Sequence, residues 1–271
     1  MLPLPVPSGK AVYYSTLKER MMVETISIRP PRIIGHRGAA GYAPENTLAA
    51  IRKAKVLGAQ WVEFDTKITQ DGVAIVFHDD ALERITGVIG ETAKTTLQDM
   101  QAFDVGTCFD AAFAGERVPT LKDAIGVLAE LGLGANIEIK PSPGLDRETA
   151  AAVIVVVKTS WPKTLPKPLI SSFEAKTLEA VRELAPELER ALIAFKIPKN
   201  WREILQRLDC VALHAQSKHL TEVKVRAIVD GGYTVRAFTV NEKIEAERLF
   251  RWGVDGVFSD FPDRLVELAG A

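Results

Sequence analysis

An alternation of short apolar strands with amphipathic helices is the feature that most limits how this chain can fold. Eight strand-like segments begin near residues 33, 61, 135, 169, 190, 210, 234 and 256. Helical patterns lie between them, for example over 121–131 and 243–251. Because parallel strands need a crossover of about a dozen residues, strands that alternate with helices favour a parallel sheet. Eight such units predict an α/β fold, a closed (β/α)8 TIM barrel.

The second strand carries an extra arm. Residues 61–80 read WVEFDTKITQDGVAIVFHDD, with a turn signal at Asp71-Gly72. Only about four residues separate the two strands of this stretch, too few for a parallel crossover. We therefore expect a β-hairpin, whose second strand is antiparallel and lies outside the count of eight.

Charged side chains stand in this hairpin where a buried strand should be apolar. Glu63 and Asp65 are two residues apart and share a face. If the turn centres on Asp71-Gly72, Asp65 faces His78; if it centres one residue earlier, Glu63 faces His78. Both registers place the imidazole on the carboxylate face, whereas a slip of one residue would not. Buried charge is costly unless it is paired or binds a cation, so this face predicts a functional site.

The remaining organisation is simple. Residues 1–31 are predicted to be an N-terminal extension, because proline punctuates both ends. Residues 32–271 are predicted to be one barrel domain. Within it, residues 81–118 have several glycines and no long periodic pattern, which is typical of an insertion over a site.

Composition excludes several classes of partner. The chain has 34 Lys and Arg against 35 Asp and Glu, a net charge of −1. This balance gives no reason to expect nucleic acid or an anionic membrane surface. We find no membrane-spanning run, no stable membrane anchor and no signal peptide pattern, so we expect a cytoplasmic protein. The sequence leaves open whether the chain forms a homo-oligomer.

Polar residues cluster where the first barrel strands end, at the edge that carries the active site in such barrels. They are His36, Arg37, Glu63, Asp65, His78, Glu138 and Lys140. Carboxylate oxygens suit one hard divalent cation, Mg²⁺ or Ca²⁺, better than zinc. An arginine and a lysine beside that cation suit a phosphate. Two histidines can share the work of general acid and general base, so the pattern predicts metal-assisted phosphoryl chemistry.

The same motifs carry a family resemblance. GHRGAAGYAPENT, EFDTKITQDG, VFHDD, ANIEIKP, SSF and FTVN occur in this order between about residues 32 and 263. Together they resemble the glycerophosphodiester phosphodiesterase family, in particular its cytoplasmic bacterial branch. The resemblance implies a TIM barrel with a segment inserted after the hairpin. It also implies hydrolysis of substrates such as glycerophosphocholine and glycerophosphoethanolamine to sn-glycerol 3-phosphate and an alcohol.

The resemblance also assigns roles to individual residues. It implies that the catalytic pair is His36 and His78. It places the metal on Glu63, Asp65 and Glu138, and the substrate phosphate near Arg37 and Lys140. One departure is visible, because the family usually has tryptophan where this chain has Phe238. Phe238 would keep an aromatic wall for the glycerol moiety without the indole N–H. The sequence does not say which histidine is the acid, nor which of the two cations binds.

Two other functions were considered. The first is a lysophospholipase D-type activity, which needs an apolar path for an acyl chain. The insertion, with Phe103, Phe109 and Phe113, is the only obvious candidate for that path. The second is a phosphodiester-binding module without turnover, which would not need two histidines.

Four further residues received weaker expectations. Asn46 fits either a helix cap or a group that orients the site. Asp79 and Asp80 are expected outside the ligand set. His214 is expected in the core more than in contact with substrate.

Overall fold

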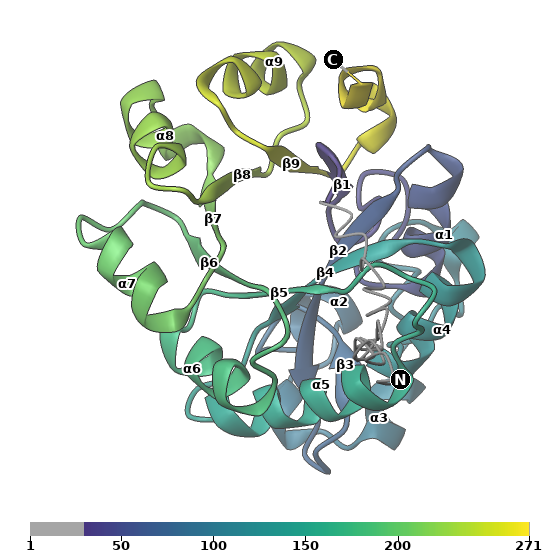
Figure 1. The fold of residues 1–271 in the computed structure, drawn as a ribbon. Helices are drawn as coiled ribbons and strands as arrows, with labels where there is room; N and C mark the ends of the chain where they lie inside the picture. Colours follow the sequence, from purple (N-terminus) through teal and green to yellow (C-terminus); the bar gives the residue numbers. More distant parts are fainter. Residues whose placement is uncertain (1–29, 271) are drawn as a thin grey trace, which may run out of the picture.

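The computed structural model describes residues 30–270, and their strands close into a barrel that is surrounded by helices (Figure 1). The expectations for residues 1–29 therefore lie outside the described residues. The strands are β1 (Ile33–Gly35), β2 (Trp61–Ile68), β3 (Ala74–Val76), β4 (Gly134–Ile139), β5 (Leu169–Ser172), β6 (Arg190–Ala194), β7 (Ala212–Gln216), β8 (Thr234–Phe238) and β9 (Gly256–Ser259).

The pairing of these strands confirms the predicted barrel. Each of β2, β4, β5, β6, β7, β8, β9 and β1 is parallel to the next, and β1 also pairs with β2, which closes the ring. The extra strand β3 is antiparallel to β2. The structure therefore has eight parallel barrel strands and one additional arm, as the sequence predicted.

Helices cover the outside of the ring. They are α1 (Leu48–Val56), α2 (Glu83–Thr86), α3 (Leu97–Ala102), α4 (Leu121–Leu131), α5 (Asp146–Ser160), α6 (Ala175–Leu184), α7 (Trp201–Leu208), α8 (Glu222–Val229) and α9 (Lys243–Trp252). After β9 the described chain forms two 3₁₀ segments, Pro262–Arg264 and Val266–Gly270. None of the helices in the described part is long and apolar enough to cross a membrane.

The first helix starts later than the sequence suggested. We expected it from Pro44-Glu45, but α1 begins at Leu48. The physical reason is local, because Asn46 has a left-handed φ of 58° and Thr47 caps the helix. The Thr47 hydroxyl accepts a hydrogen bond from the N–H of Ala50, which is the bond that a good N-cap residue makes.

The hairpin register differs from both predicted registers by one residue. Thr66 is opposite Val76, and the chain turns through a five-residue loop closed by Thr69 and Val73. The Thr69 hydroxyl also accepts a hydrogen bond from the N–H of Val73, 3.0 Å away, which fixes this longer turn. In this register a continued strand would point His78 to the face opposite Glu63 and Asp65. Strand β3 ends at Val76, however, so His78 lies beyond the paired residues and lines the site pocket.

Apolar side chains fill the barrel beneath the site. They are Ile34, Trp61, Leu169, Ala191, Ala212 and Phe258, with Phe238 partly buried against them. Along each strand, every second side chain points into the barrel. The inward-pointing side chains nearer the carboxyl ends of the strands form the site.

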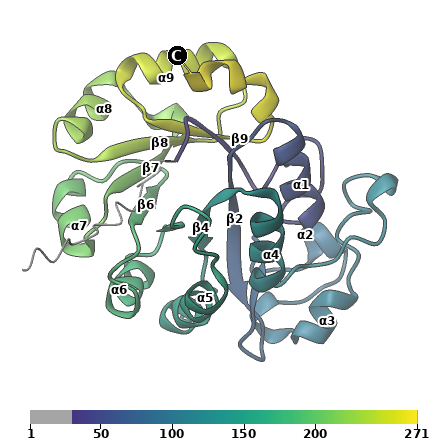
Figure 2. The same ribbon diagram turned by 45° about the vertical axis from the view of Figure 1, so that its right-hand side comes forward.

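The predicted insertion has a core of its own. The buried members of this cluster are Ile75, Phe77, Leu82, Met100, Val105 and Val118. Helices α2 and α3 belong to this segment, which projects from the side of the barrel in Figure 2. The insertion is thus a packed element attached to the hairpin.

Candidate active site

Three carboxylates form the centre of the site. Glu63 and Asp65 project from β2, and Glu138 from β4 is directly opposite Asp65 in the parallel register. One carboxylate oxygen from each of these three residues lies within 4.8 Å of the other two. All three side chains are buried, with Glu138 the most exposed at 8%. Such a cluster of buried acids needs protons or a cation.

The charge of this cluster is visible in its pKa values. Burial, followed by the charge of Asp65, raises the pKa of Glu138 to about 8. The same two causes raise the pKa of Glu63 well above its usual range. Burial also opposes ionisation of Asp65, but Arg37 and other cations outweigh it and lower the pKa of Asp65. Burial and mutual repulsion thus favour the protonated forms of Glu63 and Glu138, whereas a bound divalent cation would favour their ionised forms.

The unpaired oxygens fit such a cation. Oε1 of Glu63 and Oε1 of Glu138 are buried and have no hydrogen-bond partner among residues 30–270. A buried acceptor without a partner is costly. An all-carboxylate set suits Mg²⁺ or Ca²⁺. The residues present therefore fit the predicted metal.

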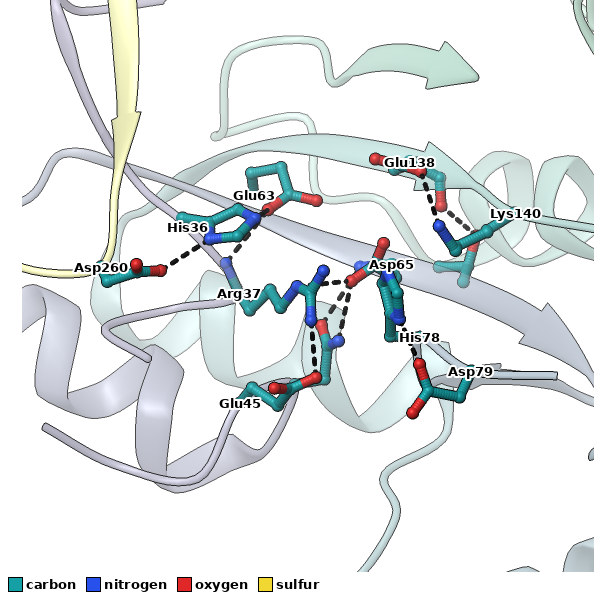
Figure 3. A network of polar contacts seen from close by, with 12 residues as sticks. His36, Arg37, Glu45, Glu63, Asp65, His78, Asp79, Glu138, Lys140 and Asp260 are labelled. Carbon is teal, nitrogen blue, oxygen red and sulfur yellow. Dashed lines mark hydrogen bonds and ion pairs between the residues drawn. The ribbon is translucent and has the colours of Figure 1, made fainter. Parts of the chain in front are cut away.

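His36 follows β1 and is oriented by a residue from the other end of the chain. Its Nδ1 lies 2.7 Å from Oδ1 of Asp260, which follows β9 beside β1. Asn241 fixes this carboxylate by donating to its Oδ2 at 2.9 Å and accepting from the backbone N–H of Asp260. The other ring nitrogen, Nε2, lies 3.9 Å from Glu63 (Figure 3). His36 thus directs Nε2 toward the acidic cluster.

His78 is held in the same manner. Its Nδ1 lies 2.5 Å from Oδ1 of Asp79. Burial lowers the pKa of His78, and the charges of Arg37 and Lys140 lower it further against the opposing effect of Asp65. A lowered pKa favours the neutral imidazole, which can accept a proton. Asp79, expected outside the ligand set, is the residue that orients His78.

Arg37 lies between the two histidines in Figure 3. Its backbone has a left-handed φ of 50°, and its N–H donates to Glu63 at 3.0 Å. The guanidinium donates to Glu45 at 2.7 Å and pairs with Asp65 at 3.2 Å. Although burial opposes its charge, these carboxylates raise the pKa of Arg37. Arg37 is therefore a fixed cation beside the cluster.

The second predicted cation, Lys140, makes longer contacts than Arg37. Nζ of Lys140 lies 3.8 Å from Glu138 and 5.5 Å from the centre of the Phe173 ring. It thus stands between the acidic cluster and an aromatic surface.

Asn46 belongs to the site. Its amide donates to Oδ2 of Asp65 at 2.9 Å and accepts from the Asp65 backbone N–H at 3.1 Å. The cap of α1 is Thr47 instead. Of the two expectations for Asn46, the structure supports the one that orients a site group.

A pocket of about 220 Å³ brings all eight predicted site residues together. Its apolar side includes three rings in mutual contact, with Phe173 4.7 Å from Phe195 and 6.0 Å from Phe238 between ring centres. The insertion phenylalanines Phe103, Phe109 and Phe113, which an acyl path would need, do not line this pocket. Phe195 is 58% exposed and forms the outer part of the wall.

Sequence reasoning missed several functional positions. Asp260 and Glu45 received no role, and Phe195 and Asn136 were not named although both line the pocket. His214 was expected in the core; it is buried and also lines the pocket. The missed signal for Asp260 was its place at the end of the last strand, which is adjacent to the first strand in any closed barrel.

Comparisons with known proteins agree with this geometry. The model of the glycerophosphoryl diester phosphodiesterase family matches residues 36–264. A glycerophosphodiester phosphodiesterase of Caldanaerobacter subterraneus subsp. tengcongensis is 32% identical over 241 residues, covering 87% of this chain and 96% of that protein. One from Bacillus subtilis is also 32% identical, over 258 residues, covering 87% of this chain and 86% of that protein.

Solved structures are similar as well. An Oleispira antarctica phosphodiesterase, determined with its product sn-glycerol-3-phosphate, has a TM-score of 0.86 and 39% identity, covering 89% of this chain and 97% of that one. A glycerophosphodiester phosphodiesterase of Agrobacterium tumefaciens has a TM-score of 0.71 and 25% identity, covering 88% and 99%. The chain therefore belongs to the glycerophosphoryl diester phosphodiesterase family.

Proposed function

We propose that this phosphodiesterase uses one divalent cation to hydrolyse glycerophosphodiesters with small head groups, such as glycerophosphocholine and glycerophosphoethanolamine. The products are sn-glycerol 3-phosphate and the free alcohol. The observation that carries the proposal is the buried cluster of Glu63, Asp65 and Glu138 beside two histidines that carboxylates orient. The similar Oleispira antarctica structure that contains sn-glycerol-3-phosphate supports the choice of product.

The three carboxylates would hold Mg²⁺ or Ca²⁺. When bound, the cation supplies positive charge that polarises the phosphoryl group and offsets the charge of the acids. Arg37 and Lys140 add cationic donors next to the cluster, where they would stabilise charge that builds on the phosphoryl oxygens. Phe238 would pack against the carbon face of the glycerol moiety.

The two histidines would divide the proton transfers. One imidazole takes a proton from the nucleophile, which is water or the glycerol 2-hydroxyl, as its oxygen bonds to phosphorus. The other gives a proton to the oxygen of the departing alcohol as the bond between that oxygen and phosphorus breaks. If the 2-hydroxyl attacks first, water opens the cyclic phosphate in a second step. Both histidines have Nδ1 engaged by a carboxylate, so Nε2 is the atom of each ring that is available for these transfers.

The test is release of sn-glycerol 3-phosphate from glycerophosphocholine by purified protein, first in chelator and then with Mg²⁺ or Ca²⁺ restored separately. We expect release to stop in chelator and to return with one of the two cations. His36→Ala and His78→Ala should each lower kcat by about 10²- to 10⁴-fold, the usual contribution of a general acid or base. Near-normal turnover by either variant would contradict the assignment.

A parallel assay with lysophosphatidylcholine separates the competing substrate class. If the protein turns over the lysophospholipid but no deacylated diester, its substrate is a lysophospholipid and the proposed substrate class is wrong. Binding of the diester without turnover under any cation would favour the binding module.

A further inference from the structure

Arg84 connects the insertion to the site. It lies in α2, and its guanidinium faces two carboxylates at once. Nε donates to Oδ2 of Asp79 at 2.6 Å. The two terminal nitrogens donate to the two oxygens of Glu45, at 2.9 and 2.7 Å. One planar cation thus satisfies both acids.

Each of these carboxylates also contacts a group in the proposed active site. Asp79 uses its other oxygen for Nδ1 of His78, at 2.5 Å. Glu45 accepts from Arg37 through Oε1, at 2.7 Å. Arg84 therefore contacts His78 through one carboxylate, that of Asp79, and contacts Arg37 through the other, that of Glu45.

The backbone that precedes Arg84 is held in place by two residues. Leu82 is 2% exposed and packs in the insertion core, and its N–H donates to the carbonyl of Gly90. Asp80 accepts from Lys67 of β2 at 2.6 Å. The guanidinium therefore reaches out from a fixed backbone.

Removing the Arg84 guanidinium would change both sides of the site. Glu45 would keep only Arg37 as a cationic partner among the described residues, which strengthens that pair and draws the Arg37 guanidinium away from the acidic cluster. Asp79 would lose the contact that fixes its second oxygen, which frees it to rotate away from His78. A planar fork is needed, since a lysine ammonium cannot hold two separate carboxylates in fixed directions.

We propose that Arg84 is a positioning residue that sets His78 and Arg37 together, so that the insertion completes the active site. The inference rests on the proposed function, because its readout is turnover of the diester.

The chain offers a matched control in Arg52. This arginine donates to both oxygens of Glu130 at 2.7 and 2.8 Å on the outside of the barrel. Its side chain is 46% exposed, against 48% for Arg84. Arg84→Met and Arg52→Met each remove a half-exposed arginine that donates to both oxygens of a glutamate. Arg84→Met also removes the bond to Asp79, and only Arg84 contacts carboxylates that hold the site.

We would measure kcat, KM and the thermal midpoint of both variants with glycerophosphocholine. Arg84→Met should lose at least about tenfold in kcat relative to Arg52→Met, the scale expected when a catalytic group is misplaced by about an ångström. The two thermal midpoints should fall by similar amounts, and added guanidinium should restore part of the turnover of Arg84→Ala. Equal kcat values for the two Met variants would overturn the inference. Failure of the wild type and Arg52→Met to turn over would instead overturn the proposed function.

Variants of the two carboxylates test the two arms separately. Asp79→Asn should lower kcat with little change in KM, because it loosens His78. Glu45→Gln should mainly raise KM, because it loosens Arg37. If Arg84→Met does not fold, Arg84→Lys against Arg52→Lys gives the same comparison with the charge retained. If the effects of Arg84→Lys and Asp79→Asn on kcat add in the double variant, the two residues act independently. That result would contradict a shared role.

Discussion

At the scale of single residues, each histidine depends on a carboxylate that orients its ring. Asp260 places Nδ1 of His36, and Asn241 holds Asp260 in turn. Asp260→Asn keeps the shape but removes the charge that stabilises a protonated imidazole. We expect kcat for the diester to fall by up to about 10⁴-fold with little change in KM, the scale of loss when a catalytic histidine keeps its place but loses the carboxylate that orients it.

Asp263→Asn is the matched control for this prediction. Asp263 accepts from the hydroxyl of Tyr42, whereas His36 is paired with Asp260. A comparable loss of kcat in both variants would show that Asp260 acts only through local stability.

The carboxylate cluster makes stability depend on pH when no cation is bound. The folded-state pKa of Glu138, about 8, exceeds its usual 4.5. Between these values the folded protein binds more protons than the unfolded chain, so the free energy of unfolding falls as pH rises. The loss is at most about 1.4 kcal/mol per pH unit for one group.

Urea unfolding in chelator from pH 5 to 8.5 measures this slope. Glu138→Gln removes the titrating group, so its curve should be flatter than that of the wild type. Added Mg²⁺ or Ca²⁺ should stabilise the wild type more at pH 8 than at pH 6, because protons compete with the cation for the same oxygens. Parallel wild-type and Glu138→Gln curves would contradict the raised pKa.

Much of the site could be predicted at this scale, because a barrel gathers the carboxyl ends of its strands at one edge. His36, Glu63 and Glu138 are examples. The roles of Asp260 and Glu45 could not be predicted, because they depend on contacts with His36 and Arg37 that only the folded structure shows. An acid at a strand end or before a helix is not informative by itself.

At the scale of elements, the insertion is stabilised by its own small core. Met100 in α3 is completely buried in that cluster. Met100→Ala should lower the free energy of unfolding by about 2–5 kcal/mol, the usual cost of such a cavity. Because α2 belongs to the same segment, turnover should fall as well.

Ile89 provides the control within the same segment. Its side chain is 89% exposed, so Ile89→Ala should change stability by less than about 0.5 kcal/mol. Chemical denaturation of both variants measures the difference. A Met100→Ala variant as stable as Ile89→Ala would mean that the insertion core is not tightly packed.

Secondary structure with a clear pattern was predictable, and local turn geometry was not. Helix α4 runs over Leu121–Leu131, as expected, because Thr120 and Asp123 form a capping box. The hairpin register was wrong by one residue because the Thr69 hydroxyl stabilises a longer turn than Asp71-Gly72 alone suggests. Side-chain bonds of this kind compete with the simplest turn and are not encoded in apolar periodicity.

At the scale of the whole molecule, the barrel interior is closely packed below the site. Gly134 begins β4 opposite Trp61, and a Cβ at this glycine would lie 2.2 Å from the indole ring. Gly134→Ala must displace a 3% exposed tryptophan, so we expect a loss of about 1–3 kcal/mol and a changed tryptophan fluorescence.

A second glycine supplies a control of opposite sign. Gly126 lies in α4, and a Cβ there meets nothing within 4 Å. Gly126→Ala should therefore stabilise the protein by about 0.5–1 kcal/mol, the propensity difference within a helix. Destabilisation of both variants to the same extent would contradict the packing argument.

The eightfold alternation made the barrel predictable, because few topologies join eight parallel strands through helices. The internal fit of Trp61 against Gly134 was not predictable, since it depends on which residues of neighbouring strands are opposite one another.

The bond between His36 and Asp260 joins residues separated by 224 positions. During synthesis on the ribosome, His36 emerges long before the carboxylate that orients it. A nascent or prematurely terminated polypeptide that stops before Asp260 carries both histidines and all three acids, yet lacks the partner of His36. A complete pair therefore requires translation to pass Asp260, and a circularly permuted gene that encodes the two strands next to each other would bring the two residues out together.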